Sequence, residues 1–289
     1  MAIYIASFGF GLVTASVLAI SAIGFTMQFG ITDVLNLSFG GVMITSAYIA
    51  YVVNSAGINI WIGLVAAGFA GAIISYLINR FVLTPFKRRN TSLVGMVIVT
   101  LALGLILENL VLAVAGPDNV SYTLNNGPTL SIGAFELTAL QVGMIVLSLV
   151  LAGAIHALLT LTRLGKAMRA TACNPGLARA SGIRTERVIS TTWLVTGALC
   201  GISGATFAIN SASFGPTSAD LFLVVIIAAV FVGGVGQPYG AMLGAVLLGI
   251  VTEVSAAIIT PDYKEVIAFI ILLVVMAVRP QGLIARARA

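Results

Sequence analysis

Long apolar runs dominate the chain and are separated by short polar segments. A transmembrane helix needs about 20 apolar residues to cross the hydrocarbon core of a bilayer, and most of the runs have about this length. We therefore predict an all-α polytopic membrane protein with about eight or nine transmembrane helices. The runs cover residues 5–27, 33–53, 58–79, 93–114, 137–160, 188–209, 221–259 and 264–279.

The run 221–259 is too long for one crossing. The sequence Gly-Gly-Val-Gly-Gln-Pro at 233–238 divides it, and the first piece is too short to cross alone as a straight helix. This predicts a broken or re-entrant segment near 221–240, and glycines with one asparagine predict a second near 30–41. Such breaks are tolerated at membrane depth where protein or water satisfies the freed backbone groups, and two of them in opposite halves of a chain point to a substrate pathway.

Glycines recur at four-residue spacing in two of the runs. Gly197 and Gly201 form one such row, and Gly236, Gly240 and Gly244 form another. Small residues on one helical face let two backbones approach closely. We interpret the rows as helix packing, while a role in transport stays open.

The overall composition excludes a water-soluble globule, because 60% of the residues are hydrophobic and only 8% are charged. Eight or nine crossings leave no room for a second soluble domain, so residues 1–289 are predicted to form a single transmembrane domain. Residues 1–29 lack the basic start of a signal peptide and are expected to form a retained span. The net charge of +5 does not indicate nucleic-acid binding, since the basic residues fall between the apolar runs.

The distribution of charge predicts an orientation. Every Lys and Arg except Lys264 lies in the segments 80–92, 161–187 or 279–289. Because basic residues near span ends stay on the cytoplasmic side, these three segments, including the C-terminus, are expected to be cytoplasmic. The stretches 116–136, 210–220 and 259–264 are then external, and the N-terminus is external if the first two runs both cross.

Candidate chemistry is sparse. There is one histidine, His156, and no phosphate-binding G-x-x-x-x-G-K-[ST] motif or paired nucleophile and base, so we predict no catalytic site, metal site or cofactor on this chain. The ionisable residues inside apolar runs are Asp33, Glu108 and Glu253. Each lies near a predicted interface, where snorkelling or access to water explains these residues better than a functional role does. Cys173 and Cys200 lie in different environments and do not suggest a disulfide.

The basic loop 161–187 contains the signals of a short helix outside the membrane. Asn174 followed by Pro175 has the order of an N-cap and a first helical residue, and Gly182 suits the left-handed position that ends a helix. These residues delimit a helix at about 175–181. A helix of about two turns is unstable alone in water, so either a partner protein or the rest of the chain must hold it.

Four sequence segments identify a family. The loop T-R-L-G-K-A-M-R-A-T-A-C-N-P-G-L-A-R-A-S-G-I at 162–183 resembles the cytoplasmic signature of permease subunits of branched-chain amino-acid ABC importers, the hydrophobic amino-acid uptake family. V-L-N-L-S-F-G-G-V-M at 34–43, V-G-G-V-G-Q-P-Y-G-A-M-L-G-A at 232–245 and R-P-Q-G-L at 279–283 are similar to further motifs of these permeases. By length, the chain resembles the shorter of the two permease types.

The resemblance implies an importer in the bacterial inner membrane with several subunits. The expected partners are a second, longer permease, two cytoplasmic ATPases that bind ATP and Mg²⁺, and an extracytoplasmic solute-binding protein. The loop 161–187 would then carry the coupling helix that docks into an ATPase.

The resemblance also implies roles for single residues. Those expected in ATPase coupling are Asn174, Pro175, Ala178, Arg179 and Gly182, with the small Ala178 and Gly182 allowing close approach and with Arg179 and Arg184 binding acidic groups of the partner. Those expected along the translocation pathway are Asn36, Ser38, Gly40 and Glu253. The chain departs from the family at Phe39, where a histidine is usual, and at Gly41, where an acidic residue is usual.

Other functions remain open at this point. Related permeases import urea, short amides or aromatic acids, so the resemblance does not fix the cargo. A self-contained secondary transporter or channel is the alternative of another class, and it would need an intramembrane relay of ionisable groups or a selectivity ring.

Overall fold

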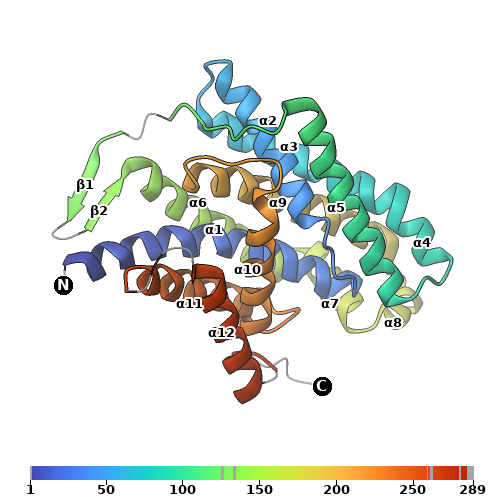
Figure 1. Ribbon diagram of the computed structural model, residues 1–289. Coiled ribbons are helices and arrows are strands. Elements are labelled where there is room, and N and C mark those ends of the chain that lie inside the picture. The colour runs from blue at the N-terminus through green and yellow to red at the C-terminus, as the bar shows by residue number, and fades with distance from the viewer. Residues whose placement is uncertain are drawn as a thin grey trace.

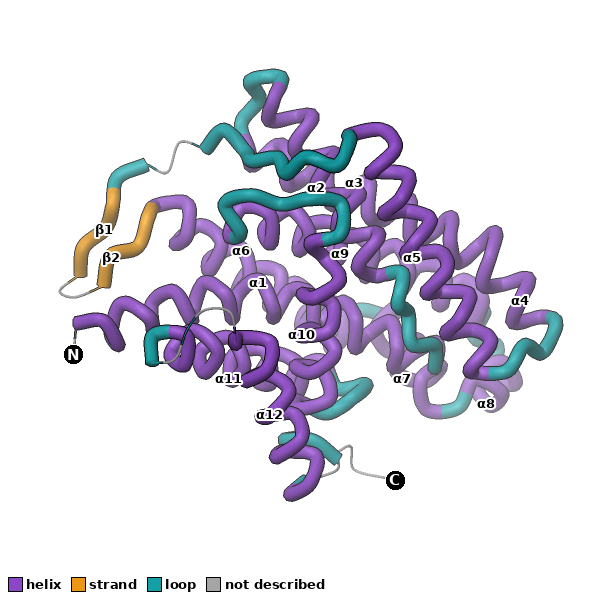
Figure 2. Tube along the Cα trace, in the orientation of Figure 1, coloured by secondary structure: helices purple, strands orange, loops and turns teal. Residues whose placement is uncertain are grey.

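A computed structural model describes residues 2–124, 127–132, 135–258, 260, 263–279 and 281–284. The apolar runs form helices close to the predicted bounds, and the chain is an all-α polytopic membrane protein (Figures 1 and 2). The helices are α1 (Ala2–Thr32), α2 (Phe39–Ser55), α3 (Ile60–Leu77), the π-helix η1 (Ile78–Leu83), α4 (Thr84–Arg88), α5 (Leu93–Ala115), α6 (Ala139–Leu161), α7 (Arg163–Cys173), α8 (Pro175–Ala180), α9 (Thr185–Asn210), α10 (Ser218–Gly233), α11 (Pro238–Ala256) and α12 (Lys264–Val278).

Six helical segments in the described part of the chain are long and apolar enough to span a membrane. They are α1, the continuous stretch from α3 to α4, α5, α6, α9 and α11. The apolar helices α2 and α10 are shorter, and the 16 residues of α10 extend over about 24 Å. The structure is therefore compatible with the predicted eight or nine crossings.

The helices α1 and α9 form the centre of the bundle. Helix α1 packs antiparallel to α11, since Gly11 lies beside Ile250 and Gly30 lies beside Gly236. Helix α9 packs antiparallel to α3 and parallel to α2, where the Cys200 thiol donates a hydrogen bond to the Phe39 carbonyl oxygen at 3.3 Å. Because these helices run along a common direction, different loops and short helices lie at the two ends of the bundle.

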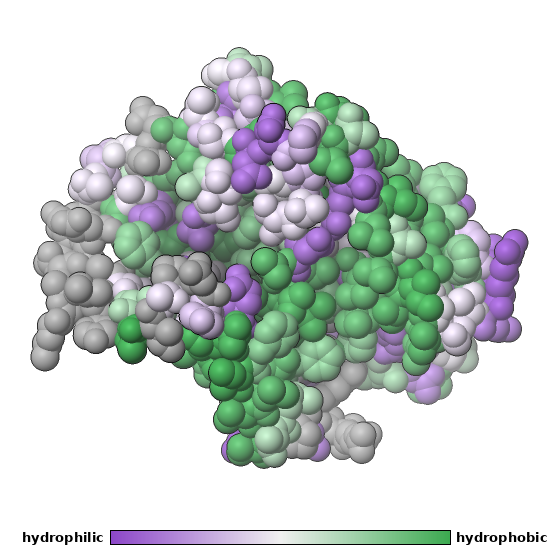
Figure 3. All heavy atoms as spheres, in the orientation of Figure 1, coloured by the Kyte–Doolittle hydropathy of each residue, from purple (hydrophilic) through white to green (hydrophobic). Residues whose placement is uncertain are grey.

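We call these two ends the basic end and the hairpin end. The basic end contains the C-terminal end of α1, α4, α7, α8 and the turn 234–237, and the hairpin end contains the start of α1 and the strands (Figure 1). In Figure 3, hydrophobic side chains cover the visible faces of α5 and α12, while hydrophilic side chains gather at the edge where α4 lies. This is the distribution expected of a bundle that meets lipid along its sides.

The glycine rows are packing contacts. A Cβ atom on Gly201 would overlap the Ala67 carbonyl oxygen of α3, and one on Gly244 would overlap the Ala229 carbonyl oxygen of α10. Gly236 does not belong to its predicted row, because it precedes the first residue of α11 and has φ +78°. Its backbone conformation, rather than helical packing, requires a glycine there.

The predicted break near 221–240 is present as the turn between α10 and α11. The turn needs positive φ at Gly234 (+112°) and Gly236 (+78°). Backbone groups around it are paired, since Gly236 N donates to Thr26 Oγ1 at 2.9 Å and Leu283 N donates to the Val232 carbonyl oxygen at 2.8 Å. The protein itself thus satisfies polar groups that a bilayer could not.

A β-hairpin and helix α7 were not predicted. Residues 116–136 were expected to be an external loop, but they include the hairpin strand β1 (Thr129–Ile132), which pairs antiparallel with β2 (Phe135–Thr138). The loop 161–187 was expected to contain one helix and contains α7 before α8. Helix α7 is amphipathic, with Met168 and Thr171 each 1% exposed and the charged Lys166 and Arg169 exposed.

Candidate functional site at the basic end

Three of the four sequence motifs, those at 162–183, 232–245 and 279–283, meet beside the end of α1 at the basic end of the bundle. A Cβ on Gly30 would lie 3.1 Å from the Gly236 Cα, and Gly282 packs against Gly234. A cavity of about 350 Å³ is lined by α1 residues together with Cys173 of α7 and Gln237 of the turn. Segments that lie far apart in the sequence, near 30, 173, 236 and 282, therefore form one surface. Pro280 and residues 285–289, which include Arg286 and Arg288 of the predicted cytoplasmic tail, are outside the described residues.

Helix α8 has both predicted caps. Asn174 Oδ1 accepts hydrogen bonds from Gly176 N and Leu177 N, each at 3.0 Å, and Pro175 is the first helical residue. At the other end Gly182 has φ +84°, and Ile183 N donates to the Ala178 carbonyl oxygen at 3.0 Å. This pair of features is a Schellman ending. The predicted bounds of 175–181 are confirmed to within one residue.

The exposed face of α8 differs from the prediction. Ala178 is 4% exposed, so its methyl group packs on the chain itself and is not free to approach a partner closely. The neighbouring Leu177 is 65% exposed, and Pro175 and Arg179 are exposed beside it. Leu177 was missed by the sequence reasoning, although a large apolar residue in a short extramembrane helix is itself a signal of a contact surface.

The turn between α6 and α7 explains Gly165 of the loop motif. A Cβ on Gly165 would overlap the carbonyl oxygens of Leu158 and Leu159 at the end of α6. The Thr162 hydroxyl accepts a hydrogen bond from Gly165 N at 3.0 Å and caps α7. The loop therefore leaves α6 in a fixed direction, which determines where α8 lies.

The linker 33–38 between α1 and α2 is held by a buried polar network. Asn36 is 2% exposed, and its amide group donates to Gln28 Oε1 at 3.2 Å. Its Oδ1 accepts from Ser38 N at 3.1 Å and from Ser38 Oγ at 2.5 Å. The Thr100 hydroxyl of α5 binds the same linker through Leu37 N and the Leu35 carbonyl oxygen. The structure thus supplies partners for the Asn36 amide within the chain, and its role along a pathway stays a prediction.

The start of α2 joins α5 and α10. Gly40 packs against Leu223 of α10, and Gly41 packs against the backbone of Gly104 in α5. Phe39, one of the two positions at which the sequence departs from the motif it resembles, is 2% exposed and makes an edge contact with Phe25, with 5.5 Å between ring centroids. Both departures from the family pattern are therefore occupied by close packing.

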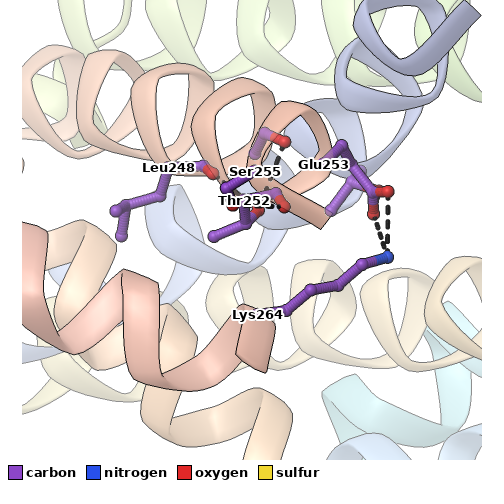
Figure 4. Close-up of polar contacts among 7 residues, drawn as sticks. Leu248, Thr252, Glu253, Ser255 and Lys264 are labelled. Carbon is purple, nitrogen blue, oxygen red and sulfur yellow. Dashed lines mark hydrogen bonds and ion pairs between the residues drawn. The ribbon is translucent and has the colours of Figure 1, made fainter. Parts of the chain in front are cut away.

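Glu253 lies at the hairpin end, remote from the other predicted pathway residues. Lys264 Nζ of α12 lies 2.8 Å and 2.9 Å from the two carboxylate oxygens, and the Thr14 hydroxyl of α1 donates to Glu253 Oε1 at 3.0 Å. Figure 4 shows the two charged side chains pointing toward one another from α11 and α12. Their side chains are 15% and 35% exposed, so the pair is partly shielded from solvent. Glu253 thus ties three helices together and is not brought near Asn36, Ser38 or Gly40.

Two further polar residues were singled out in the sequence. His156 Nδ1 lies 2.7 Å from the Tyr239 hydroxyl, which joins α6 to α11. Glu108 is 6% exposed in α5, and its carboxyl group lies near that of Asp220 in α10. Outside the membrane-spanning helices, burial raises the pKa of Tyr122, whose hydroxyl donates to the Ala47 carbonyl oxygen at 2.9 Å. These contacts pair polar groups of different segments.

Comparison with known proteins identifies the family. The family described as "Branched-chain amino acid transport system / permease component" matches residues 7–276. The chain belongs to this family. It is a family of membrane subunits of transporters, and the match covers all the long helices described above.

Individual relatives extend over nearly the whole chain. The permease LivH of Escherichia coli K12, named as a high-affinity branched-chain amino acid transport system permease protein, is 29% identical over 96% of this chain and 94% of its own length. The probable LivH of Methanocaldococcus jannaschii is 30% identical over 94% of this chain and 90% of its own length. The permease LivM of Escherichia coli K12 is 26% identical over 93% of this chain but only 68% of its own length. The chain therefore resembles the shorter permease type.

Proposed function

We propose that this protein is the shorter permease subunit of an ABC importer and that it carries branched-chain or other hydrophobic amino acids across the bacterial inner membrane. It would form half of the translocation pathway, with a longer LivM-like permease as the other half. Two ATPase subunits would bind ATP and Mg²⁺, and an extracytoplasmic solute-binding protein would deliver the cargo. This chain would perform no covalent chemistry and bind no cofactor.

The capped helix α8 is the observation that carries the proposal. Its two ends are fixed by Asn174 and Gly182, and it presents Leu177 and Arg179 to the surroundings. An exposed leucine beside an arginine suits a partner with an apolar cleft and acidic rim, because the leucine loses contact with water and the guanidinium gains charge-assisted hydrogen bonds. An ATPase that moves during hydrolysis could transmit the movement through α8 to α9, which starts five residues after α8 ends.

Charge supports an orientation with the basic end in the cytoplasm. Lys87, Arg88 and Arg89 lie on α4 or at its end, and the bases of α7 and α8 lie at the same end of the bundle. Basic residues beside spans are retained on the cytoplasmic side. The start of α1 and the β1–β2 hairpin would then face the solute-binding protein, and α12 would bring the C-terminus to the cytoplasm.

The linker 33–38 and the start of α2 are the parts of this chain that we assign to the pathway. Asn36 and Ser38 fix the linker, and Gly40 lets α2 lie close to α10. Movement of α1 or α10 would therefore move α2. ATP bound to a partner can shift such an equilibrium only through contacts that differ between the inward-facing and outward-facing states. Glu253 and Lys264 would hold the outer ends of α11 and α12 together in one of these states.

Cargo uptake by living cells tests the proposal. A strain that lacks its own branched-chain uptake systems would express this permease with a longer permease, two ATPases and a binding protein of one importer. We expect uptake of labelled leucine that isoleucine and valine inhibit and that urea, short amides and aromatic acids do not. Inhibition by urea or an amide instead would assign another cargo of the same family. Uptake that persists without the ATPases would favour a self-contained transporter.

A further inference from the structure

A second cavity lies at the basic end of the bundle, beside the proposed coupling helix. Its volume is about 450 Å³, within the range of sites for small molecules. It lies between the end of α1, η1 and α4, the start of α5, α8 and the start of α9. Both Pro175 and Arg179 of the proposed coupling helix border it.

The charged groups of this cavity are only partly paired. Arg88 binds Glu186 at 3.3 Å, and Lys87 Nζ donates to the Thr32 carbonyl oxygen at 3.2 Å. Asp33, in contrast, has no described Lys or Arg nitrogen within 4.0 Å of its carboxylate, and Arg80 and Arg179 have no described carboxylate within that distance. The cavity therefore offers unpaired groups of both signs.

Apolar residues form one part of the remaining lining, and the uncharged polar residues Thr32, Asn79, Thr84, Asn90, Thr185 and Ser190 form the other part. Ile31 and Val34 come from α1 and the linker, Leu83 from η1, Met96 from α5 and Ile189 from α9. Trp193 of α9 also borders the cavity, is 1% exposed, and its indole nitrogen has no hydrogen-bond partner within the described chain. A small ligand that fits these walls needs an anionic group, a cationic group and an apolar part.

We propose that this cavity binds a free amino acid with an apolar side chain. The α-carboxylate would contact Arg80 and Arg179, the ammonium group would contact Asp33, and the side chain would lie against Ile31, Val34 and Met96. An inorganic phosphate or an anionic lipid headgroup would leave Asp33 unpaired and would not use the apolar wall. The inference rests on the proposed function, which places this class of molecule on the side where the basic end lies.

The position of the cavity implies that a bound ligand would restrict movement of the coupling helix α8. A ligand that bridges Arg179 of α8 to Asp33 at the end of α1 would hold the coupling helix at a fixed distance from the start of the linker. It would also compete with the acidic groups of the ATPase for the Arg179 guanidinium. Movement of α8 relative to α1 is what the proposed mechanism requires. We therefore expect imported product that accumulates on this side to slow ATP hydrolysis by the complex.

The test uses the complete permease pair with both ATPases in nanodiscs, without the solute-binding protein. Binding of labelled L-leucine is measured at equilibrium for the native complex and for Asp33→Asn and Arg80→Gln. Asparagine tolerates the φ of +53° at residue 33, so the first variant keeps the backbone. Asp118→Asn at the hairpin end and Arg163→Gln at the start of α7 are matched controls that remove the same charges outside the cavity.

We expect saturable leucine binding that each cavity variant weakens at least about tenfold, the effect of losing one hydrogen bond to a charged group, with both controls unchanged. Equal binding by all five proteins, or none by the native complex, would overturn the proposal. Displacement of leucine by inorganic phosphate at equal concentration would also overturn the proposal, because the cavity would then be a general anion site. Leucine binding that appears only after the ATPases are removed would overturn it as well, because the cavity would then be part of the surface that contacts the ATPase.

A second measurement separates this inference from the proposed function. ATP-driven leucine uptake is recorded for the same five proteins with the solute-binding protein present. Normal uptake without leucine binding at the cavity contradicts the inference alone. Absence of leucine uptake by the native complex contradicts the proposed cargo.

Discussion

At the scale of single residues, glycines allow the helices of this bundle to approach closely. Gly201→Ala would place a methyl group against the Ala67 carbonyl oxygen, so we expect the free energy of unfolding to fall by about 1–3 kcal/mol. Gly153→Ala on α6 is the matched control, because its added Cβ would have no atom within 4 Å beyond the adjacent backbone of its own helix. That change should be neutral or stabilise the helix by up to about 1 kcal/mol. Thermal unfolding of the two purified variants compares them, and equal melting temperatures would contradict the packing account.

The Asn36 network makes a second prediction at this scale. Asn36→Leu removes the acceptor of Ser38 N and the donor to Gln28, and leaves these groups buried without their partner. We expect a loss of about 1–3 kcal/mol in the free energy of unfolding. Asn36→Asp, which keeps the acceptor oxygen, serves as the control for Ser38. A variant Asn36→Leu that melts at the native temperature and assembles, but does not transport, would show that the residue contacts cargo instead of stabilising the linker.

Residue types could be predicted from the sequence more readily than their partners. The sequence singled out Asn36, Glu253 and Gly182, because a polar group in an apolar run or a glycine after a helix has a local signature. The partner of Glu253 is Lys264 on another helix, and no local signal in the sequence pairs these two residues. Contacts between helices depend on rotation about each helix axis, which an all-round apolar sequence does not specify.

At the scale of elements, the sequence predicted those helices and breaks that apolar run length, capping residues, glycines or prolines mark locally. The helix bounds followed from apolar length, and the break between α10 and α11 followed from glycines and a proline. Helix α7 was missed, although Thr162 and the spacing of Gly165, Met168 and Thr171 could have indicated an amphipathic helix. The β1–β2 hairpin was missed because four-residue strands give too short an alternation to stand out from a loop.

The exposed face of α8 makes the prediction that belongs to this scale. Leu177→Asp would place a charge in the proposed ATPase contact, so we expect loss of ATPase co-purification by more than about tenfold. Leu177→Met keeps the volume and apolar character and should bind normally. Asn174→Ala removes one cap at a cost of about 1 kcal/mol, so its effect should be smaller. Co-purification from membranes measures all three, and full retention of the ATPases by Leu177→Asp would contradict the docking role of α8.

At the scale of the whole molecule, the segregation of charge predicts the orientation in the membrane. Single cysteines would be introduced by Lys87→Cys, Arg179→Cys and Ser121→Cys after replacement of Cys173 and Cys200. A thiol reagent that does not cross membranes should label only the Ser121 position in intact cells. Ser121 lies in the described part of the stretch 116–136 that the sequence predicts to be external. Labelling at Arg179 in sealed cells would reverse the orientation and remove the coupling role.

The central claim concerns the whole assembly, in which this chain moves cargo only when partner subunits hydrolyse ATP. Its most direct test is leucine uptake into proteoliposomes that contain both permeases and the ATPases, with ATP on the side of the basic end and loaded binding protein on the other side. We predict uptake that requires ATP and every subunit, and that Leu177→Asp abolishes while Leu177→Met preserves it. Uptake by this chain alone, or uptake driven by an ion gradient without ATP, would contradict the account.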